Sequence, residues 1–282
     1  MALNPDAVGL EWDGGTRTWT STDAILYALG VGAGAEDPLA ELAFTTENTH
    51  DVRQQVLPTF AVTLGGGRPP ASLGEINLAR MLHAEQSVTL HRPLPVAGTV
   101  RVTSRLAGLY DKGSGALAVM ESSSTDESTG ELLAESRTGL FFRSEGGFGG
   151  DRGTSEPWAV PDRPADHVVV SRPREDQALL YRLSGDRNPL HSDPWLAARA
   201  GFDRPILHGL CTYGFTGRVL LHAVCDSDPA SFGGMSVRFA APVLPGQELS
   251  VHIWDEGDTC LFRTMVGDTV VLDRGTFTRK AR

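Results

Sequence analysis

Alternating hydrophobic and polar positions along much of the chain predict short β-strands. The clearest runs are residues 99–104 (Thr-Val-Arg-Val-Thr-Ser) and residues 248–254 (Glu-Leu-Ser-Val-His-Ile-Trp). A period of two with β-branched residues is typical of a strand that buries one face, and Pro and Gly between such runs supply the turns. We expect further strands at 115–123, 131–143, 260–266 and 269–279. The strands therefore fall into two groups, one in each half of the chain.

A different pattern predicts one helix ahead of the strands in each half. Ser21 and Asp23 are residue types that cap helix N-termini, and they precede the apolar run 24–29, which ends at Gly30. Residues 208–225 are apolar around most of the helix circumference, which is typical of a buried helix. One buried helix with each curved antiparallel sheet predicts an α+β fold.

A short repeated motif indicates that the two halves arose by duplication. Residues 87–93 (Ser-Val-Thr-Leu-His-Arg-Pro) resemble residues 236–242 (Ser-Val-Arg-Phe-Ala-Ala-Pro), and each run continues through a second Pro to a Gly. The match is short enough to arise by chance between two hairpins. The same order of strands after each copy favours duplication over chance.

The chain divides at a segment rich in Gly and Pro, residues 146–165. Gly frees the backbone and Pro removes hydrogen-bond donors, so this composition is typical of a linker. We expect an N-terminal repeat over 1–145 and a C-terminal repeat over 166–282. A length of 282 residues fits two units at roughly 150 residues each.

Composition and charge narrow the class of protein. With 25 Lys+Arg against 35 Asp+Glu, the net charge of −10 argues against a nucleic-acid binder, although local basic residues can still hold an anionic substrate. Cys211, Cys225 and Cys260 have no paired spacing and are expected to be reduced thiols. The N-terminus has no signal-peptide pattern, and no apolar run approaches the roughly 20 residues that span a bilayer. We therefore expect a cytoplasmic protein that does not enter a membrane.

Residues 181–191, Tyr-Arg-Leu-Ser-Gly-Asp-Arg-Asn-Pro-Leu-His, concentrate polar side chains in a short segment. Asp186, Asn188 and His191 lie close together in the chain, and a short helix with its own N-cap at Asp193 follows. Gly, Asp, Asn and Pro are also the residues of an ordinary turn. Composition alone therefore leaves a functional loop and a plain turn equally supported.

This segment resembles the hydratase 2 motif of the MaoC-like dehydratases, the (R)-specific enoyl-CoA hydratases. Residues 82–86 and 110–115 are similar to the non-catalytic half of the two-repeat members of that family. The resemblance implies a double hotdog, in which two curved antiparallel sheets each wrap a central helix. It implies hydration of trans-2-enoyl-CoA to (3R)-3-hydroxyacyl-CoA by a homodimer, with no cofactor because coenzyme A is part of the substrate.

The resemblance also implies the roles of individual residues. Asp186 and His191 would be the catalytic pair, Asn188 their positioning partner, and Gly209 the oxyanion-hole glycine. Hydration needs a base for water, an acid for C2 and a donor for the enolate oxygen. A His suits the first role near neutral pH, and a carboxyl in a dry pocket suits the second. Without the family, Gly209 would be interpreted only as the start of a helix.

The same resemblance assigns substrate-binding residues. His83 matches the first residue of a His-Gly pair in the family, although this chain has Ala84 where Gly is usual. Lys112 matches a position that meets the coenzyme A part of the substrate, and Phe239 matches an acyl-pocket position. A hairpin-turn lysine and a core phenylalanine are the plain alternatives.

Two His-x-x-Cys pairs on the second helix suggest a metal at first glance. His208 and His222 would lie about 21 Å apart at 1.5 Å per residue. Neither pair alone supplies enough ligands for zinc, so no metal is expected.

Two other functions compete with the hydratase. The same residues could dehydrate a (3R)-3-hydroxyacyl-acyl carrier protein, and that acidic partner would need a basic rim at the mouth of the site. A non-catalytic acyl-thioester-binding hotdog is the other alternative, although a binder has no use for an acid–base pair.

Overall fold

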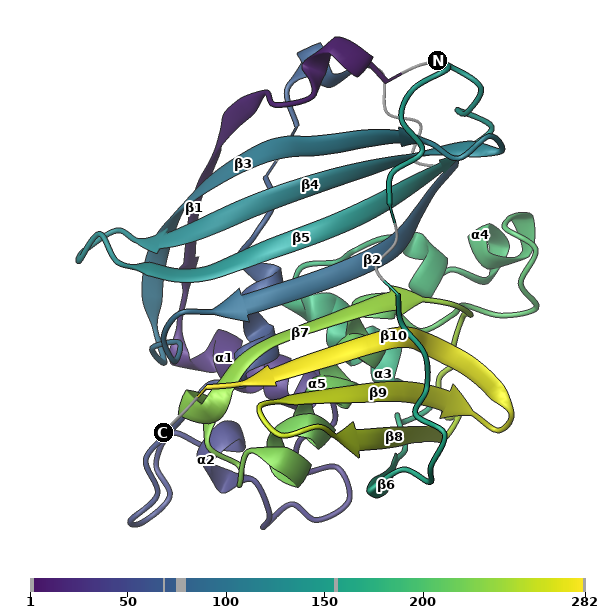
Figure 1. Ribbon diagram of the computed structural model, residues 1–282. Helices are drawn as coiled ribbons and strands as arrows, with labels where there is room; N and C mark the ends of the chain where they lie inside the picture. Colours follow the sequence, from purple (N-terminus) through teal and green to yellow (C-terminus); the bar gives the residue numbers. More distant parts are fainter. Residues whose placement is uncertain (1–2, 68, 75–79, 155–156, 281–282) are drawn as a thin grey trace.

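Ten strands of the described chain form one antiparallel sheet in the order β1-β3-β4-β5-β2-β7-β10-β9-β8-β6 (Figure 1). The structure is a computed structural model, and it describes residues 3–67, 69–74, 80–154 and 157–280. The strands are β1 (Glu11–Trp19), β2 (Met81–Leu90), β3 (Gly98–Asp111), β4 (Gly115–Asp126), β5 (Leu132–Arg143), β6 (His167–Ser171), β7 (Phe232–Phe239), β8 (Leu249–Asp255), β9 (Thr259–Val266) and β10 (Thr269–Arg279).

All six strands expected from the alternating pattern are present, as β3, β4, β5, β8, β9 and β10. Four strands were not among them: β2 and β7, which overlap the two copies of the repeated motif, and the edge strands β1 and β6. In β1 the register shifts between Asp13 and Gly15, and this bulge interrupts the alternation that would have revealed the strand. β6 has only five residues, and it pairs with β8 alone. Short or bulged strands are usual at sheet edges, where they discourage further pairing.

The strand order relates the two halves by an approximate twofold axis. Counted from each edge inward, β1-β3-β4-β5-β2 corresponds to β6-β8-β9-β10-β7. The halves join where β2 pairs with β7, and Ser87 lies opposite Ser236 in that pairing. Because these serines begin the two copies of the repeated motif, the motif lies on the axis.

Both predicted helices are present, as α1 (Ser21–Gly30) and α5 (Gly209–Val224). The N-cap of α1 is Thr20 rather than Ser21 or Asp23. The Thr20 side chain accepts the Asp23 N–H, and the Asp23 carboxylate accepts the Thr20 N–H at 2.8 Å. The remaining helices are α2 (Leu42–Thr45), α3 (Gln177–Tyr181) and α4 (Pro194–Arg199).

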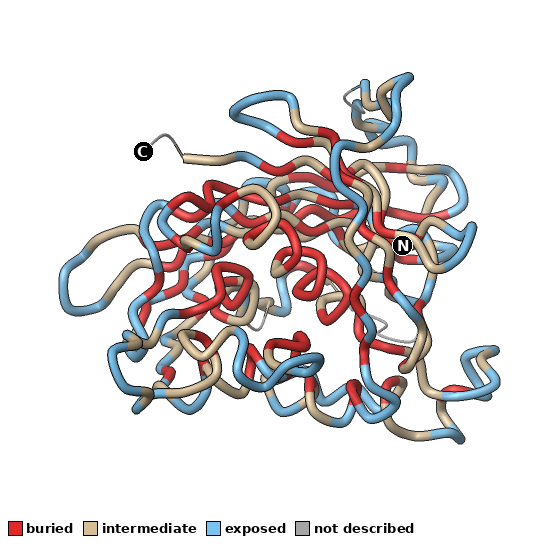
Figure 2. The backbone as a smooth tube through the Cα atoms, turned by 90° about the horizontal axis from the view of Figure 1, so that it is seen from below, coloured by how far each residue is buried: buried red, intermediate tan, exposed pale blue. Residues whose placement is uncertain are grey.

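α5 is the buried helix of the second half, and it also packs against the first half. A Cβ on Gly217 would lie 2.3 Å from Thr59 Cγ2, and one on Gly214 would lie 2.4 Å from Val31 Cγ1. Glycine at these positions allows the first-half segments to approach the helix backbone closely. One apolar core therefore spans both halves, and Figure 2 shows its buried residues gathered in the middle of the molecule.

Among the described residues of the first half there is no long counterpart of α5. α1 follows β1 as α3 follows β6, and these two helices pack against each other. The place that corresponds to α5 holds η2 (Pro58–Thr63), a 3₁₀ segment that packs on α5, β2 and β5. In the part of the chain that the structure describes, the double hotdog therefore has a full central helix in the second half alone, and the helix predicted in the first half lies against α3 instead.

The Gly- and Pro-rich linker crosses the outer face of the sheet between the halves (Figure 1). Asp111 accepts hydrogen bonds from the N–H groups of Gly147 and Gly149, at 2.9 and 2.8 Å. The Trp158 indole N–H donates to the Gly275 carbonyl at 3.2 Å. Residues 155–156 of the predicted linker lie outside the described residues, as do 1–2, 68 and 75–79 of the N-terminal repeat and 281–282 of the C-terminal repeat.

Cys211, Cys225 and Cys260 are free and buried, as expected for reduced thiols. Among the residues that the structure describes, no helix is long and apolar enough to cross a membrane.

Candidate active site

The turn-forming residues of 181–191 shape a loop that presents Asp186. Gly185 has a φ of +125°, which glycine adopts without strain and which turns the chain after Ser184. The Asp186 carboxylate then accepts the Asn188 main-chain N–H at 3.0 Å, and Asn188 Oδ1 accepts the Leu190 N–H at 3.0 Å. Asn188 therefore contacts Asp186 through its main chain, while its side chain caps the 3₁₀ turn that carries His191.

His191 is held in one tautomer. Its Nδ1 lies 2.9 Å from the Ile206 carbonyl oxygen, and because a carbonyl only accepts, Nδ1 carries the proton and Nε2 is free to act as a base. The residue is 8% exposed, and burial lowers the pKa of His191 against smaller opposing effects of the Ile206 bond and the Asp186 charge. His191 is thus neutral at physiological pH.

A second histidine, His208, lies against this pair. Its ring stacks on His191 with centroids 3.8 Å apart and planes 28° apart, and its Nε2 lies 3.2 Å from the Asp186 main-chain carbonyl. Burial, with a further contribution from His191, lowers the pKa of His208 to about 4. No role in the site was predicted for His208, which stood out in the sequence only as half of a His-x-x-Cys pair; its position between the motif loop and the helix start was the available signal.

Asp186 is exposed, so the chain alone does not supply the dry pocket expected around a proton-donating carboxyl. Potential ligand atoms of Asp186, His191 and His208 lie within 4.8 Å of one another. Stacked imidazole rings direct their in-plane lone pairs side by side, however, and a tetrahedral ion needs them to converge. The cluster therefore suits proton transfer better than chelation, and the absence of a metal stays a prediction.

Gly209, Phe239 and His83 meet at the seam between the halves. A Cβ on Gly209, the first residue of α5, would lie 3.1 Å from Phe239 Cε1, and the Phe239 and His83 rings have centroids 4.8 Å apart. His83 Nε2 lies 3.1 Å from Gln86 Oε1, and burial lowers the pKa of His83 to about 4. Pairing of β2 with β7 thus brings a first-half histidine to the start of the second-half helix. Ala84 lies where the β2–β5 register shifts.

Lys112 lies away from these residues, on the turn between β3 and β4. Its ammonium donates to the Arg152 carbonyl and lies 5.5 Å from the centroid of the Tyr110 ring. These contacts hold the linker against the hairpin. The structure therefore brings six of the seven predicted site residues together and gives Lys112 a contact with the linker instead.

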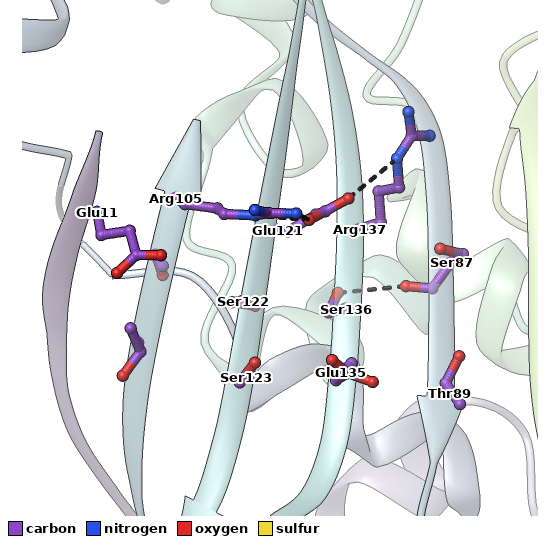
Figure 3. A pocket seen from close by; sticks show the side chains of 12 residues that line it. Glu11, Ser87, Thr89, Arg105, Glu121, Ser122, Ser123, Glu135, Ser136 and Arg137 are labelled. Atoms are coloured by element: carbon purple, nitrogen blue, oxygen red, sulfur yellow. Dashed lines mark hydrogen bonds and ion pairs between the residues drawn. The ribbon is translucent and has the colours of Figure 1, made fainter. Parts of the chain in front are cut away.

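Of two surface pockets in the described structure, one adjoins the cluster of Asp186, His191 and His208 and the other does not. One of about 210 Å³ has His191 in its wall, together with the apolar side chains of Ala178, Leu179, Pro205 and Pro245. A larger one, of about 430 Å³, lies on the first-half sheet and is lined by ion-paired residues such as Arg105 and Glu121 (Figure 3). None of the predicted site residues lines the larger pocket, which has the character of a solvated sheet face.

The low pKa values of His208 and His83 predict a loss of stability in acid. Because the pKa of His208 is about 4 when folded against an ordinary value of 6.5, the unfolded chain binds more protons between these pH values, and the same holds for His83. The free energy of unfolding should have its full value above pH 6.5. It should fall by about 2 kcal/mol per histidine between pH 7 and pH 5. Urea unfolding at both pH values measures this. His208→Phe should remove its share of the pH dependence, and an unchanged dependence would contradict the assignment.

Two protein-family models match the chain, and the boundary between them lies between β5 and β6, where the two halves of the sheet also separate along the chain. Residues 18–144 match the MFE-2 hydratase 2 N-terminal domain, and residues 155–274 match the MaoC like domain. The 3-hydroxyacyl-thioester dehydratase Y of Mycobacterium tuberculosis is 46% identical over 98% of both chains. An enoyl-CoA hydratase of the same organism is 44% identical over 85% of both chains.

Solved structures of MaoC-like proteins have a similar fold. A MaoC-like dehydratase from Phytophthora capsici superimposes with a TM-score of 0.88 at 32% identity, covering 99% of this chain and 98% of that one. A Mycobacterium tuberculosis protein described as a double hotdog fold, with a TM-score of 0.59, 15% identity and 96% of each chain covered, supports the fold alone.

Proposed function

The chain belongs to the MaoC-like dehydratase family, in its two-repeat hydratase 2 form, and from this premise we propose that it hydrates trans-2-enoyl-CoA to (3R)-3-hydroxyacyl-CoA and catalyses the reverse dehydration. The observation that carries the proposal is the cluster of a neutral His191, the Asp186 carboxyl and the N-terminus of α5. A hydratase and a dehydratase among the relatives correspond to the two directions of one reaction.

In the proposed mechanism, His191 Nε2 takes a proton from water as the water oxygen bonds to C3 of the substrate. The π electrons of the C2=C3 bond move towards the thioester, and the enolate oxygen receives the Gly209 N–H at the start of α5, where the helix dipole favours negative charge. The Asp186 carboxyl then gives a proton to C2. Solvent exchange afterwards returns a proton from His191 to Asp186.

Every role in this scheme is filled by a residue of the chain, so we propose that no cofactor is required. Phe239 and His83 lie next to Gly209 and would contact the acyl group. We further propose a cytoplasmic homodimer; the free, buried cysteines fit a reducing compartment.

A carrier-protein dehydratase is the second candidate because exposed arginines lie in the catalytic loop and on the helix that follows it. Arg187 lies within the loop, and Arg199 lies on α4 with its guanidinium 4.8 Å from the centroid of the Trp195 ring. These charges could contact an acidic carrier or the phosphates of coenzyme A.

The test is a comparison of matched thioesters. We expect crotonyl-CoA to be hydrated with loss of enoyl absorbance, to give the (3R) product on chiral analysis, and to show a higher kcat/KM than the crotonyl-carrier protein. A higher kcat/KM on the carrier thioester, falling with salt and on Arg187→Glu, would favour the second candidate. Tight binding of acyl-CoA without turnover would identify a non-catalytic binder, and a (3S) product would contradict the proposal.

A further inference from the structure

We propose that His208 is a positioning residue that sets the relative places of the acid, the base and the oxyanion donor. The inference rests on the proposed hydratase chemistry, because it assigns His208 to the same site. His208 itself is not required to exchange a proton with substrate.

Three contacts tie His208 to the three groups of the reaction. Its Nε2–H donates to the Asp186 main-chain carbonyl at 3.2 Å, which anchors the exposed loop that carries the carboxyl. Its ring stacks on the His191 ring at 3.8 Å, while Ile206 fixes the rotation of that ring through Nδ1. Its own main chain leads directly into Gly209, as the N-cap residue of α5. One rigid side chain at the N-terminus of a buried helix is thus connected to all three groups and fixes their positions relative to one another.

The second nitrogen of His208 indicates that the ring is kept for its position and not for stability. Since the Asp186 carbonyl only accepts, Nε2 carries the proton and Nδ1 is a bare acceptor. Nδ1 is buried with no hydrogen-bond partner, in a residue that is 1% exposed. An unpaired buried acceptor costs free energy, and such groups are retained where function requires them.

A graded series of variants separates the hydrogen bond from the stacking. His208→Phe keeps a ring against His191 but cannot donate to Asp186, while His208→Gln keeps a donor without the ring. We expect His208→Phe to lower kcat about 10- to 100-fold with little change in KM, because a displacement of about 1 Å can cost 10²-fold in rate. His208→Gln should recover part of that loss, and His208→Ala should be the slowest.

Thermal stability distinguishes positioning from a merely structural role. His208→Phe removes the unpaired Nδ1 and leaves the Asp186 carbonyl in an exposed loop, where water can replace the donor. Its melting temperature at pH 7 should therefore equal or exceed that of the wild type while kcat falls. A variant with wild-type kcat, or one whose loss of kcat accompanies a lower melting temperature, would overturn the proposal.

A measurement without substrate keeps this inference separate from the proposed reaction. Nitrogen-15 chemical shifts of the imidazoles should show His208 protonated at Nε2 only, and the Asp186 amide signals should shift in His208→Phe. If the wild type hydrates no enoyl-CoA, the proposed function fails whatever these spectra show. If the wild type is active but His208 is protonated at Nδ1, the positioning role fails alone.

Discussion

Asp186→Asn and His191→Ala are each expected to lower kcat for enoyl-CoA hydration by about 10²-fold or more. Loss of a positioned general acid or base costs about 10² to 10⁴ in rate. His191→Ala removes the Nε2 base, and Asp186→Asn removes the ionisable carboxyl but retains an oxygen to accept the Asn188 N–H. Steady-state kinetics on crotonyl-CoA, with circular dichroism to confirm folding, measures the effect.

The double variant and a neighbouring carboxylate provide the controls. If Asp186 and His191 act as one unit, the double variant should be little slower than either single variant. Asp193 caps α4 by accepting the Trp195 N–H at 2.9 Å, and Asp193→Asn should keep near-wild-type kcat because asparagine caps equally well. Near-wild-type turnover by a folded Asp186→Asn or His191→Ala variant would refute the catalytic assignment.

Gly209→Val is expected to depress kcat/KM by about 10²- to 10³-fold, the usual cost of losing an oxyanion donor. The added side chain would hold the thioester oxygen away from the N–H groups at the start of α5. The shape of the pH profile should not change, since no titrating group is removed. The measurement is kcat/KM as a function of pH on short and long 2-enoyl-CoAs.

The Phe239 ring complicates this variant, because a Cβ on Gly209 would lie only 3.1 Å from it. Phe239→Ala alone, and combined with Gly209→Val, separates displacement of the ring from obstruction of the oxyanion donor. The double variant should remain as slow as Gly209→Val. His83→Gln, in contrast, should change mainly KM or acyl-length preference. If Gly209→Val hydrates these substrates normally and His83→Gln has no activity, the assignment of catalysis to the second half is wrong.

Local patterns in the sequence determined most of the secondary structure. α5 was predictable because its apolar positions surround the helix, and the burial of both its faces follows directly from that pattern. Six of the ten described strands, three in each half, followed from their period of two. β1 escaped prediction because its bulge breaks the period, and the cap of α1 moved to Thr20 because a capping box depends on two side chains together.

Within the candidate site, too, features that depend on neighbouring residues were predictable and features that depend on distant segments were not. Asp186, Asn188 and His191 lie in one short segment whose hydrogen bonds are local, so the segment stood out in the sequence. Its composition fitted an ordinary turn equally well, and the resemblance to the hydratase 2 motif favoured the functional interpretation. Lys112 was also assigned by a local match, but the linker that contacts it comes from 40 residues further along the chain. A contact of that kind has no signature at the position itself.

The sequence by itself determined six of the ten described strands, the buried helix and the polar loop at 181–191, because each depends on neighbours within a few residues. Only the tertiary structure decided that η2 takes the place of a second central helix, that β2 and β7 join the halves, and that His83 reaches Gly209 and Phe239. It also decided that His208 contacts Asp186 and His191 at once. Such contacts depend on close packing between segments far apart in the chain, and hydrophobic periodicity specifies which face is buried but not what it meets.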